Sequence, residues 1–235
     1  SIYEQFGSGL ILRTWEDRQL GINNSMWGVR TRYESEKIDV KLLAGYQKKG
    51  REISTGKILG LDTEISLSED LQFGISYVGR FENITYDFGD FTNLFSSRLD
   101  YYSDSFYMNY EYISKSKDGI VQFGNVSENF VKPGNAHSLN FGVYKSGFGF
   151  DMTFRRLENM GYFSDRYEAS GDYLETSINY LPALTKQHDY LLSNINVYEA
   201  QPYVSFQDPK LMKAGEIGFQ LDLYYNFEKG SPLGG

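Results

Sequence analysis

The sequence predicts an all-β protein, an antiparallel up-and-down β-barrel of about 12 strands. Apolar and polar residues alternate with a period of two along most of the chain, as in strands whose two faces differ. Aromatic residues make up 17% of the chain, with 20 Tyr and 17 Phe, and both residue types favour strands. The 24 Gly and 5 Pro fit a fold with many tight turns. The whole chain, 1–235, is expected to be one domain.

The first predicted element is a hairpin over residues 3–33. Its first strand includes 7–12, a polar loop follows over 16–25, and the return strand over 26–33 places Trp27 and Val29 opposite Arg30 and Arg32. The next elements are expected in this order: strand 38–47, turn 48–53, strand 59–67, turn 68–70 and strand 71–81.

Alternation stops over 83–104, which we interpret as a long exposed loop. The remaining elements are expected in this order: strand 106–112, turn 115–119, weak strand 120–127, loop 130–136, strand 139–144, turn 145–147, strand 148–155, loop 159–172, strand 174–180, turn 184–189, an extended stretch 190–203 and strand 217–227. Most predicted strands have about 9–11 residues, the length that crosses a bilayer. Short turns that alternate with longer loops are typical of outer-membrane barrels.

Charge and hydropathy narrow the location of the protein. The net charge of −8 argues against nucleic-acid binding, which needs a basic surface. No stretch approaches the roughly 18 apolar residues of a membrane helix, and the mean hydropathy is −0.46. A transmembrane β-barrel in the bacterial outer membrane fits both observations, because lipid-facing and lumen-facing residues alternate. Its outer face would contact outer-membrane lipids. A soluble antiparallel β protein with its apolar face turned inward is the alternative.

The candidate functional residues are charged side chains on the polar face of the predicted strands. Rings of charge that line a pore set its ion selectivity, whereas charges of mixed sign can also pair and fill the lumen. The residue pattern leaves both roles open. The candidates are Arg13, Arg30, Arg32, Lys41, Asp62, Glu64, Arg80, Glu111, Asp151, Arg155, Glu175 and Asp222.

Catalytic and metal-binding patterns are weak. The two histidines, His137 and His188, lie at predicted turn or loop edges, without the spacing of a nucleophile and its base. The absence of cysteine excludes thiolate metal sites. Asp87 and Asp90 do not have the spacing of a calcium loop. We therefore expect no enzymatic activity, no cofactor and no metal.

The opening segment resembles a known family through residues 3–10 (YEQFGSGL), 12–13, 15–17 and 20–25, followed by Gly28 and Arg30. Weaker similarities lie at 223–226 and 231–235. The family is an uncharacterised, porin-like outer-membrane barrel family of Bacteroidota, a domain of unknown function. The resemblance implies an internal portion of a longer barrel and no established catalytic residues. Phe227 is followed by EKGSPLGG instead of a closing aromatic-terminated strand, which agrees with an incomplete barrel.

The sequence is compatible with three functions. The first is a porin-like channel for passive diffusion of small hydrophilic solutes through a polar, charged lumen. The second is a non-conducting barrel that acts as a structural subunit of an envelope complex, or binds a partner protein through loops 83–104 and 159–172. The third is a soluble β protein or a barrel enzyme.

Overall fold

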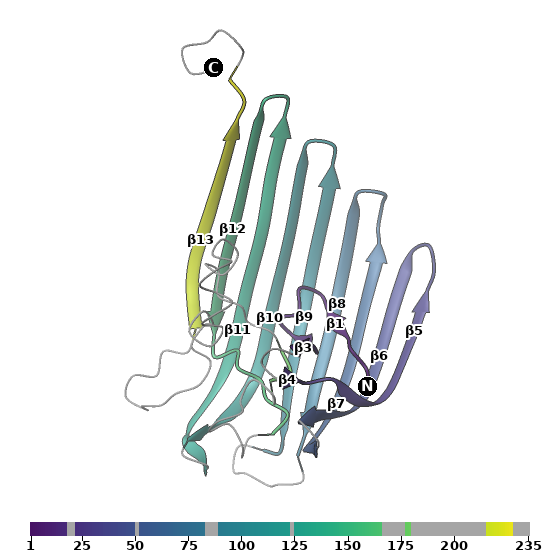
Figure 1. Ribbon diagram of the computed structural model, residues 1–235, viewed down its shortest axis with the longest axis vertical. Coiled ribbons are helices and arrows are strands. Elements are labelled where there is room, and N and C mark those ends of the chain that lie inside the picture. The colour runs from purple at the N-terminus through teal and green to yellow at the C-terminus, as the bar shows by residue number, and fades with distance from the viewer. Residues whose placement is uncertain are drawn as a thin grey trace.

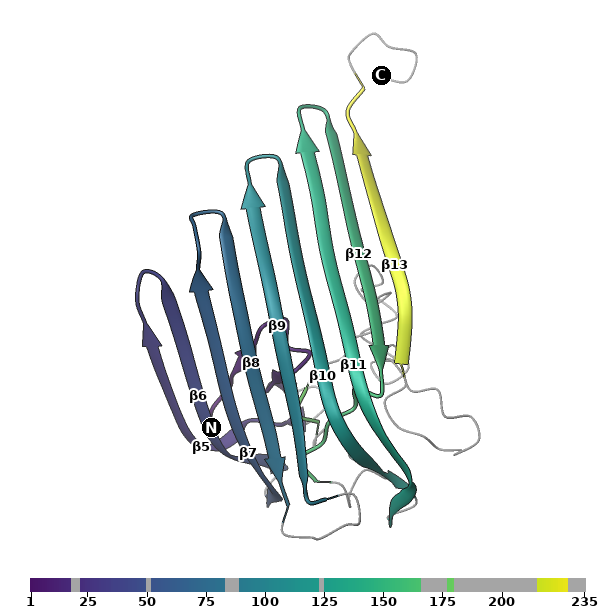
Figure 2. The ribbon, with the colours of Figure 1, turned by 180° about the vertical axis from the view of Figure 1, so that it is seen from behind.

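The structure is a computed structural model that describes residues 1–17, 22–49, 52–82, 89–122, 125–165, 177–179 and 215–227. Nine long strands of this part of the chain form one antiparallel sheet, in which each strand pairs with its neighbours in sequence order (Figure 1, Figure 2). They are β5 (Met26–Glu34), β6 (Ile38–Lys49), β7 (Glu52–Ser66), β8 (Leu71–Phe81), β9 (Phe91–Ser103), β10 (Phe106–Gln122), β11 (Asn125–Lys145), β12 (Phe148–Glu158) and β13 (Gly215–Tyr225).

The prediction of an all-β, antiparallel, up-and-down architecture is confirmed. Within the described residues the sheet is open, with β5 and β13 as its end strands. The expected strands 174–180 and 190–203 lie largely or wholly outside the described residues, and 177–179 contributes only an isolated bridge from Ser177 to Phe163. None of the described residues belongs to a helix long and apolar enough to cross a membrane.

One register runs across all nine strands and separates two faces of different chemistry. Along one row of paired residues, Thr31, Leu42, Leu61, Tyr77 and Phe95 share a face. We call this the outer face. It exposes large apolar side chains from every strand of the first half and from β13, including Trp27, Val29, Tyr33, Leu42, Leu59, Leu61, Ile75, Phe95, Ile217, Phe219, Leu221 and Leu223. The opposite, inner face carries most of the charged residues of the strands.

Residues 1–17, 22–25, 159–165 and 177–179 pack against the inner face, and we call them the inner cover. The cover includes the short strands β1 (Gln5–Phe6), β2 (Leu12–Arg13), β3 (Glu16–Asp17) and β4 (Ile22–Asn23). In Figure 1 the labels of β1, β3 and β4 lie over the lower half of the sheet, away from the short hairpin turns at its upper end.

A hydrophobic core joins the inner cover to the sheet. From the sheet it includes Leu43, Ile58, Val78, Leu94, Ile113, Ala136 and Leu157, and from the cover Phe6, Leu10, Ile11, Leu12, Met160, Tyr162 and Ile178. All of these side chains are at most 3% exposed. Burying each large apolar side chain stabilises the fold by about 1.5–3 kcal/mol. The inner face therefore carries a band of apolar side chains where the cover lies, with buried charged clusters beside it.

The prediction that 7–12 belong to the first strand of the wall is wrong. This segment folds back over the sheet because Gly7 and Gly9 have positive φ values of 52° and 91°, which reverse the chain direction. Its apolar run, 10–12, is buried without alternation, because the side chains lie in the core between two layers instead of on a two-faced strand.

Three predicted loops or turns are also wrong. Most of the expected loop 83–104 is the strand β9. The expected turn 115–119 lies inside β10, and the expected loop 130–136 lies inside β11, so these strands reach 17 and 21 residues instead of about 9–11. The pairing of β10 with β11 shifts register between Lys115 and Asp118, and Pro133 sits unpaired at this bulge. A bulge tolerates proline because the extra residue need not donate a ladder hydrogen bond.

We predict that Gly7→Ala loosens the inner cover. Gly7 has a left-handed backbone, and a Cβ there would lie 2.7 Å from Arg98 Cδ and 2.9 Å from Glu111 Oε1. The backbone strain alone should lower the free energy of unfolding by about 1–2 kcal/mol, and the contacts should add to it. Gly89→Ala is the matched control, because Gly89 also has a positive φ of 98° but nothing lies within 4 Å of the added atom. Chemical denaturation measures the free energy of unfolding of both variants. Equal losses of stability would show that the contacts with Arg98 and Glu111 add nothing to the backbone strain.

Candidate functional site

The inner face brings together most of the charged residues singled out in the sequence. The register places Arg30, Arg32, Lys41, Asp62, Glu64, Arg80, Glu111, Asp151, Arg155 and Asp222 on this face. Arg13 lies in β2 of the inner cover. Glu175 lies outside the described residues. Most of the placed residues belong to ion pairs, so the charges are organised in local clusters across neighbouring strands.

The first cluster centres on Asp62 of β7. Its Oδ1 accepts hydrogen bonds from Arg98 Nη2 at 2.7 Å and from Ser76 Oγ at 2.6 Å. Lys41 Nζ lies 3.6 Å from the other carboxylate oxygen. The guanidinium of Arg98 also donates to Ser76. Four strands are tied together by this network, and its buried charges are compensated.

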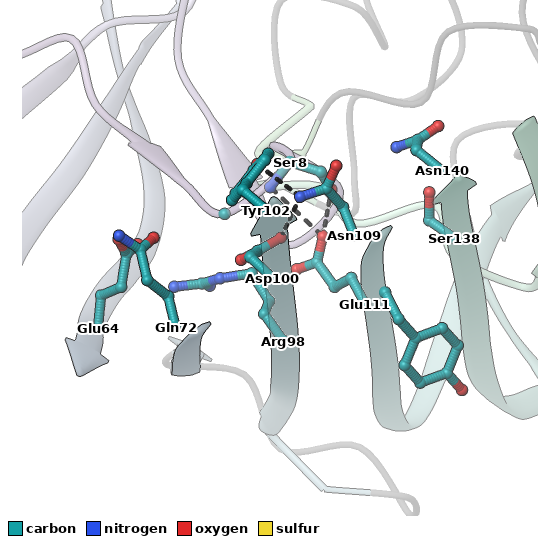
Figure 3. Close-up of a pocket in the computed structure, with 12 residues that line it drawn as sticks. Ser8, Glu64, Gln72, Arg98, Asp100, Tyr102, Asn109, Glu111, Ser138 and Asn140 are labelled. Atoms are coloured by element: carbon teal, nitrogen blue, oxygen red, sulfur yellow. Dashed lines mark hydrogen bonds between the residues drawn. The ribbon is translucent and has the colours of Figure 1, made fainter. Parts of the chain in front are cut away.

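The second cluster connects the inner cover to β10 through Glu111. The Glu111 carboxylate accepts a hydrogen bond from Ser96 Oγ at 2.6 Å, and both the backbone N–H and the hydroxyl of Ser8 donate to it. Arg98 is its register neighbour on β9. The glycine before Ser8 allows the cover to approach this closely. Figure 3 shows Ser8 above Glu111.

The third cluster is the most deeply buried and centres on Arg80, which is wholly inaccessible. Its guanidinium donates to Asp118 Oδ1 at 2.8 Å and to Thr92 Oγ1 at 3.0 Å. It also donates to the Phe163 carbonyl oxygen and lies 5.3 Å from the centre of the Tyr162 ring. Both of these residues belong to the inner cover, so Arg80 joins cover and wall.

Two further residues complete the third cluster. Glu82 Oε2 lies 3.5 Å from Arg80 Nε. Lys115 Nζ donates to the Gly161 carbonyl oxygen at 2.6 Å and lies 4.0 Å from Asp118. Backbone carbonyl groups of 161–163 are thus held by side chains from two strands of the sheet. The connection after β12 is thereby fixed against the inner face.

Ion pairs also occupy the end strands. Arg32 forms two hydrogen bonds of 2.9 Å with Asp39, across β5 and β6. Arg155 donates to Glu216 Oε1 at 2.7 and 2.8 Å and so connects β12 to β13. Arg30 lies 3.4 Å from Glu4 of the inner cover. The Arg32 and Arg30 pairs have half-exposed guanidinium groups and contribute little to stability, whereas Arg155 is buried.

A polar cavity of about 380 Å³ opens on the inner face beside the cover (Figure 3). Side chains from β7 to β11 and the loop with Ser8 line it. Its lining includes Glu64, Gln72, Arg98, Asp100, Tyr102, Asn109, Glu111, Ser138 and Asn140. Asn109 Nδ2 donates to Asp100 Oδ1 at 2.7 Å and also contacts the Tyr102 hydroxyl.

The charge distribution changes along the strands. Arginines and lysines gather near the inner cover, each beside a carboxylate. Further towards the short turns, Glu64, Asp100 and Asp151 form no ion pair with any described residue. Asp151 instead accepts a hydrogen bond from Tyr107 at 2.7 Å and another from Tyr144. This part of the inner face is consequently acidic.

Sequence reasoning missed Arg98, Asp100, Lys115 and Asp118. All four lie in segments that were interpreted as a loop or a turn. Arg98 and Asp100 could have been found from the alternation across 91–101, where Thr92, Leu94, Ser96, Arg98 and Asp100 share the inner face.

The residues considered for catalysis or metal binding do not come together in the described part of the chain. His137 lies on the outer face, with its Nδ1 2.9 Å from the Tyr110 hydroxyl. His188 and Asp87 lie outside the described residues. No described group of three or more His, Cys, Asp or Glu side chains is arranged to hold a metal ion.

We predict that Arg80→Met strongly destabilises the protein. The substitution leaves the buried carboxylates of Asp118 and Glu82 without their guanidinium. Breaking a buried ion pair by removing one partner costs about 3–5 kcal/mol. Arg32→Met is the control: the Arg32 side chain is about half exposed, so we expect a much smaller change. Chemical denaturation measures the free energy of unfolding of both variants. Similar losses of stability would refute the importance of the buried cluster.

Comparison with known proteins gives a family but no activity. No curated protein and no solved structure matches the chain. A family described as "Family of unknown function (DUF6029)" matches residues 1–235. Since the match covers the whole chain, the protein belongs to the DUF6029 family, whose function is unknown.

Proposed function

We propose that this chain forms part of the wall of a porin-like outer-membrane β-barrel, along whose inner face small hydrophilic solutes diffuse. The observation that carries the proposal is the contrast between the two faces of the sheet. Ile217, Val29 and Leu223 are 73%, 67% and 67% exposed on the outer face, within an apolar surface that extends over many strands. Soluble proteins rarely expose apolar surfaces of this extent, whereas lipid stabilises them.

Strand length supports the same proposal. Strands β8, β12 and β13 each have 11 residues. At about 3.3 Å per residue and a tilt near 45°, such a strand spans about 26 Å, close to the apolar band of outer-membrane barrels. Closure of the sheet into a barrel is part of the proposal, because unpaired backbone groups at a strand edge are unfavourable in lipid.

The inner cover favours a second candidate function, a barrel that does not conduct. The cover is held to the wall by a hydrophobic core and by the Glu111 and Arg80 clusters, and it occupies part of the inner face. A plugged barrel would act as a structural or partner-binding subunit of an envelope complex. Most of the predicted docking loop 83–104 is the strand β9, and 166–172 of the second loop lies outside the described residues. Partner docking through these loops therefore stays a prediction.

We predict that Leu221→Arg prevents stable membrane insertion, whereas Gln220→Arg does not. The two residues are neighbours on β13, with Leu221 on the outer face and Gln220 on the inner face. Arginine at the lipid-facing midplane of a barrel costs about 2–4 kcal/mol. The readout is the fraction of protein that resists carbonate extraction from outer-membrane vesicles. A soluble protein would show no difference between the variants, and that outcome would refute the membrane proposal.

We predict cation-preferring conductance in planar bilayers. Glu64, Asp100 and Asp151 have no ion-pair partner among the described residues, and rings of carboxylates favour cations. The reversal potential across a salt gradient measures the preference. Asp100→Asn should lower the cation-to-anion permeability ratio, whereas Glu34→Gln, an exposed position at the end of β5, should change it little.

The same bilayer experiment separates the two candidate functions. Steady channels with a reversal potential that responds to Asp100→Asn would support the porin-like function. Protein that inserts but remains silent would support the plugged barrel. Anion preference would contradict the assignment of the inner face as the route.

A further inference from the structure

We propose that the polar cavity of Figure 3 binds a small, neutral, polyhydroxylated solute such as a monosaccharide or disaccharide. The proposal deepens the porin-like function, on which it rests for the route by which the solute arrives. The site itself requires only the folded sheet and its inner cover. Its volume of about 380 Å³ lies in the lower part of the range for small-molecule pockets, roughly 300–1,000 Å³.

The charged groups of the cavity disfavour an anionic ligand. Arg98 is the cation among the lining residues, and its guanidinium is engaged by Asp62 and Ser76. Glu64 and Asp100 also line the cavity and form no ion pair with a described residue. A phosphate or carboxylate group in this space would meet a compensated arginine and two negative charges.

Four lining side chains are available for hydrogen bonds. Glu64, Gln72, Ser138 and Asn140 are all partly buried, yet none of them makes a side-chain hydrogen bond to a described residue. Together they offer carboxylate and carbonyl acceptors, amide donors and a hydroxyl that can do both. A polyhydroxylated solute presents donors and acceptors in close succession, which this mixture of groups can satisfy. In Figure 3, Glu64 and Gln72 lie on one side of Asp100 and Asn109, and Ser138 and Asn140 lie on the other side.

A second group of lining residues is already fixed in place. Asn109 bridges Asp100 and the Tyr102 hydroxyl, and Glu111 is held by Ser8 and Ser96. These bonds orient the remaining acceptor positions of the two carboxylates before a ligand arrives. Preorganised groups lose less conformational entropy on binding. Ser8 belongs to the inner cover, so the cover completes one wall of the site.

Binding is expected to be weak, because most of the lining side chains are polar and exchange bonds to water for bonds to the solute. Among the described lining residues Tyr102 adds aromatic surface, and none is aliphatic. Weak binding suits a solute in transit, because conduction requires a solute that can leave as well as enter.

The test is titration of the detergent-purified protein with glucose and sucrose, followed by saturation-transfer NMR over a millimolar range. We expect saturable binding of at least one sugar. Gln72→Ala and Asn140→Ala should each weaken it about two- to tenfold, since each removes one hydrogen-bonding group. Both side chains lack bonds to described residues, so the fold should persist in the variants. Thr153→Ala is the control: Thr153 pairs with Asn140 on the same face but does not line the cavity.

Glucose 6-phosphate is the anionic comparison, and it should bind more weakly than glucose. Absence of saturable sugar binding, unchanged affinity in both cavity variants, or tighter binding of the phosphorylated sugar would each overturn the proposal. Conductance of the same preparation tests the porin-like function independently of sugar binding. A protein that binds sugar but does not conduct would support the binding site and contradict the porin-like function. A protein that conducts but binds no sugar would support the porin-like function and contradict the binding site.

Discussion

The structure depends on one register maintained across nine strands. Because side chains alternate along a strand, a slip of one residue would exchange the two faces of that strand. Lys41 would then enter the apolar outer face, and Leu42 would lie beside Asp62. The ion pairs of Asp62 with Lys41 and Arg98 form only in the observed register, since they join β6, β7 and β9 on one face. Register, face chemistry and inner-face charge pairing therefore support one another.

The inner cover introduces a second constraint. The buried apolar core lies between the cover and the sheet, not between two sheets. Buried charge is placed at the edge of this core, where Arg80 reaches both Asp118 on β10 and the Phe163 carbonyl oxygen of the cover. An uncompensated charge there would be costly, so the cover can leave the wall only if this cluster finds other partners. Cover and wall are thus expected to fold as one unit.

The fold class and the two faces could be predicted from the sequence, because period-two alternation reports strand faces directly. Strands β6, β8 and β12 lie close to their predicted ranges. The cover could not be predicted this way, because its residues contact strands far away in sequence. A signal was nevertheless present. Consecutive apolar pairs, Leu42-Leu43, Ile58-Leu59, Tyr77-Val78, Leu94-Phe95 and Tyr112-Ile113, recur in successive strands, with one member on each face.

The apolar pairs lie at the level along the strands where the cover contacts the wall. The polar residues closer to the short turns form the part of the inner face that the cover leaves exposed. Val78 and Leu94 are buried under the cover, whereas Gln72 and Asp100, on the same strands, line the cavity. Most residues that anchor the cover therefore differ from those that would meet a solute, and Glu111, which holds Ser8 and lines the cavity, belongs to both groups. A change at Asp100 or Asn140 alters the polar surface without touching the core, and a change at Arg80 alters the core without touching that surface. This separation allows one strand sequence to specify both a stable interior and a hydrophilic surface for solutes.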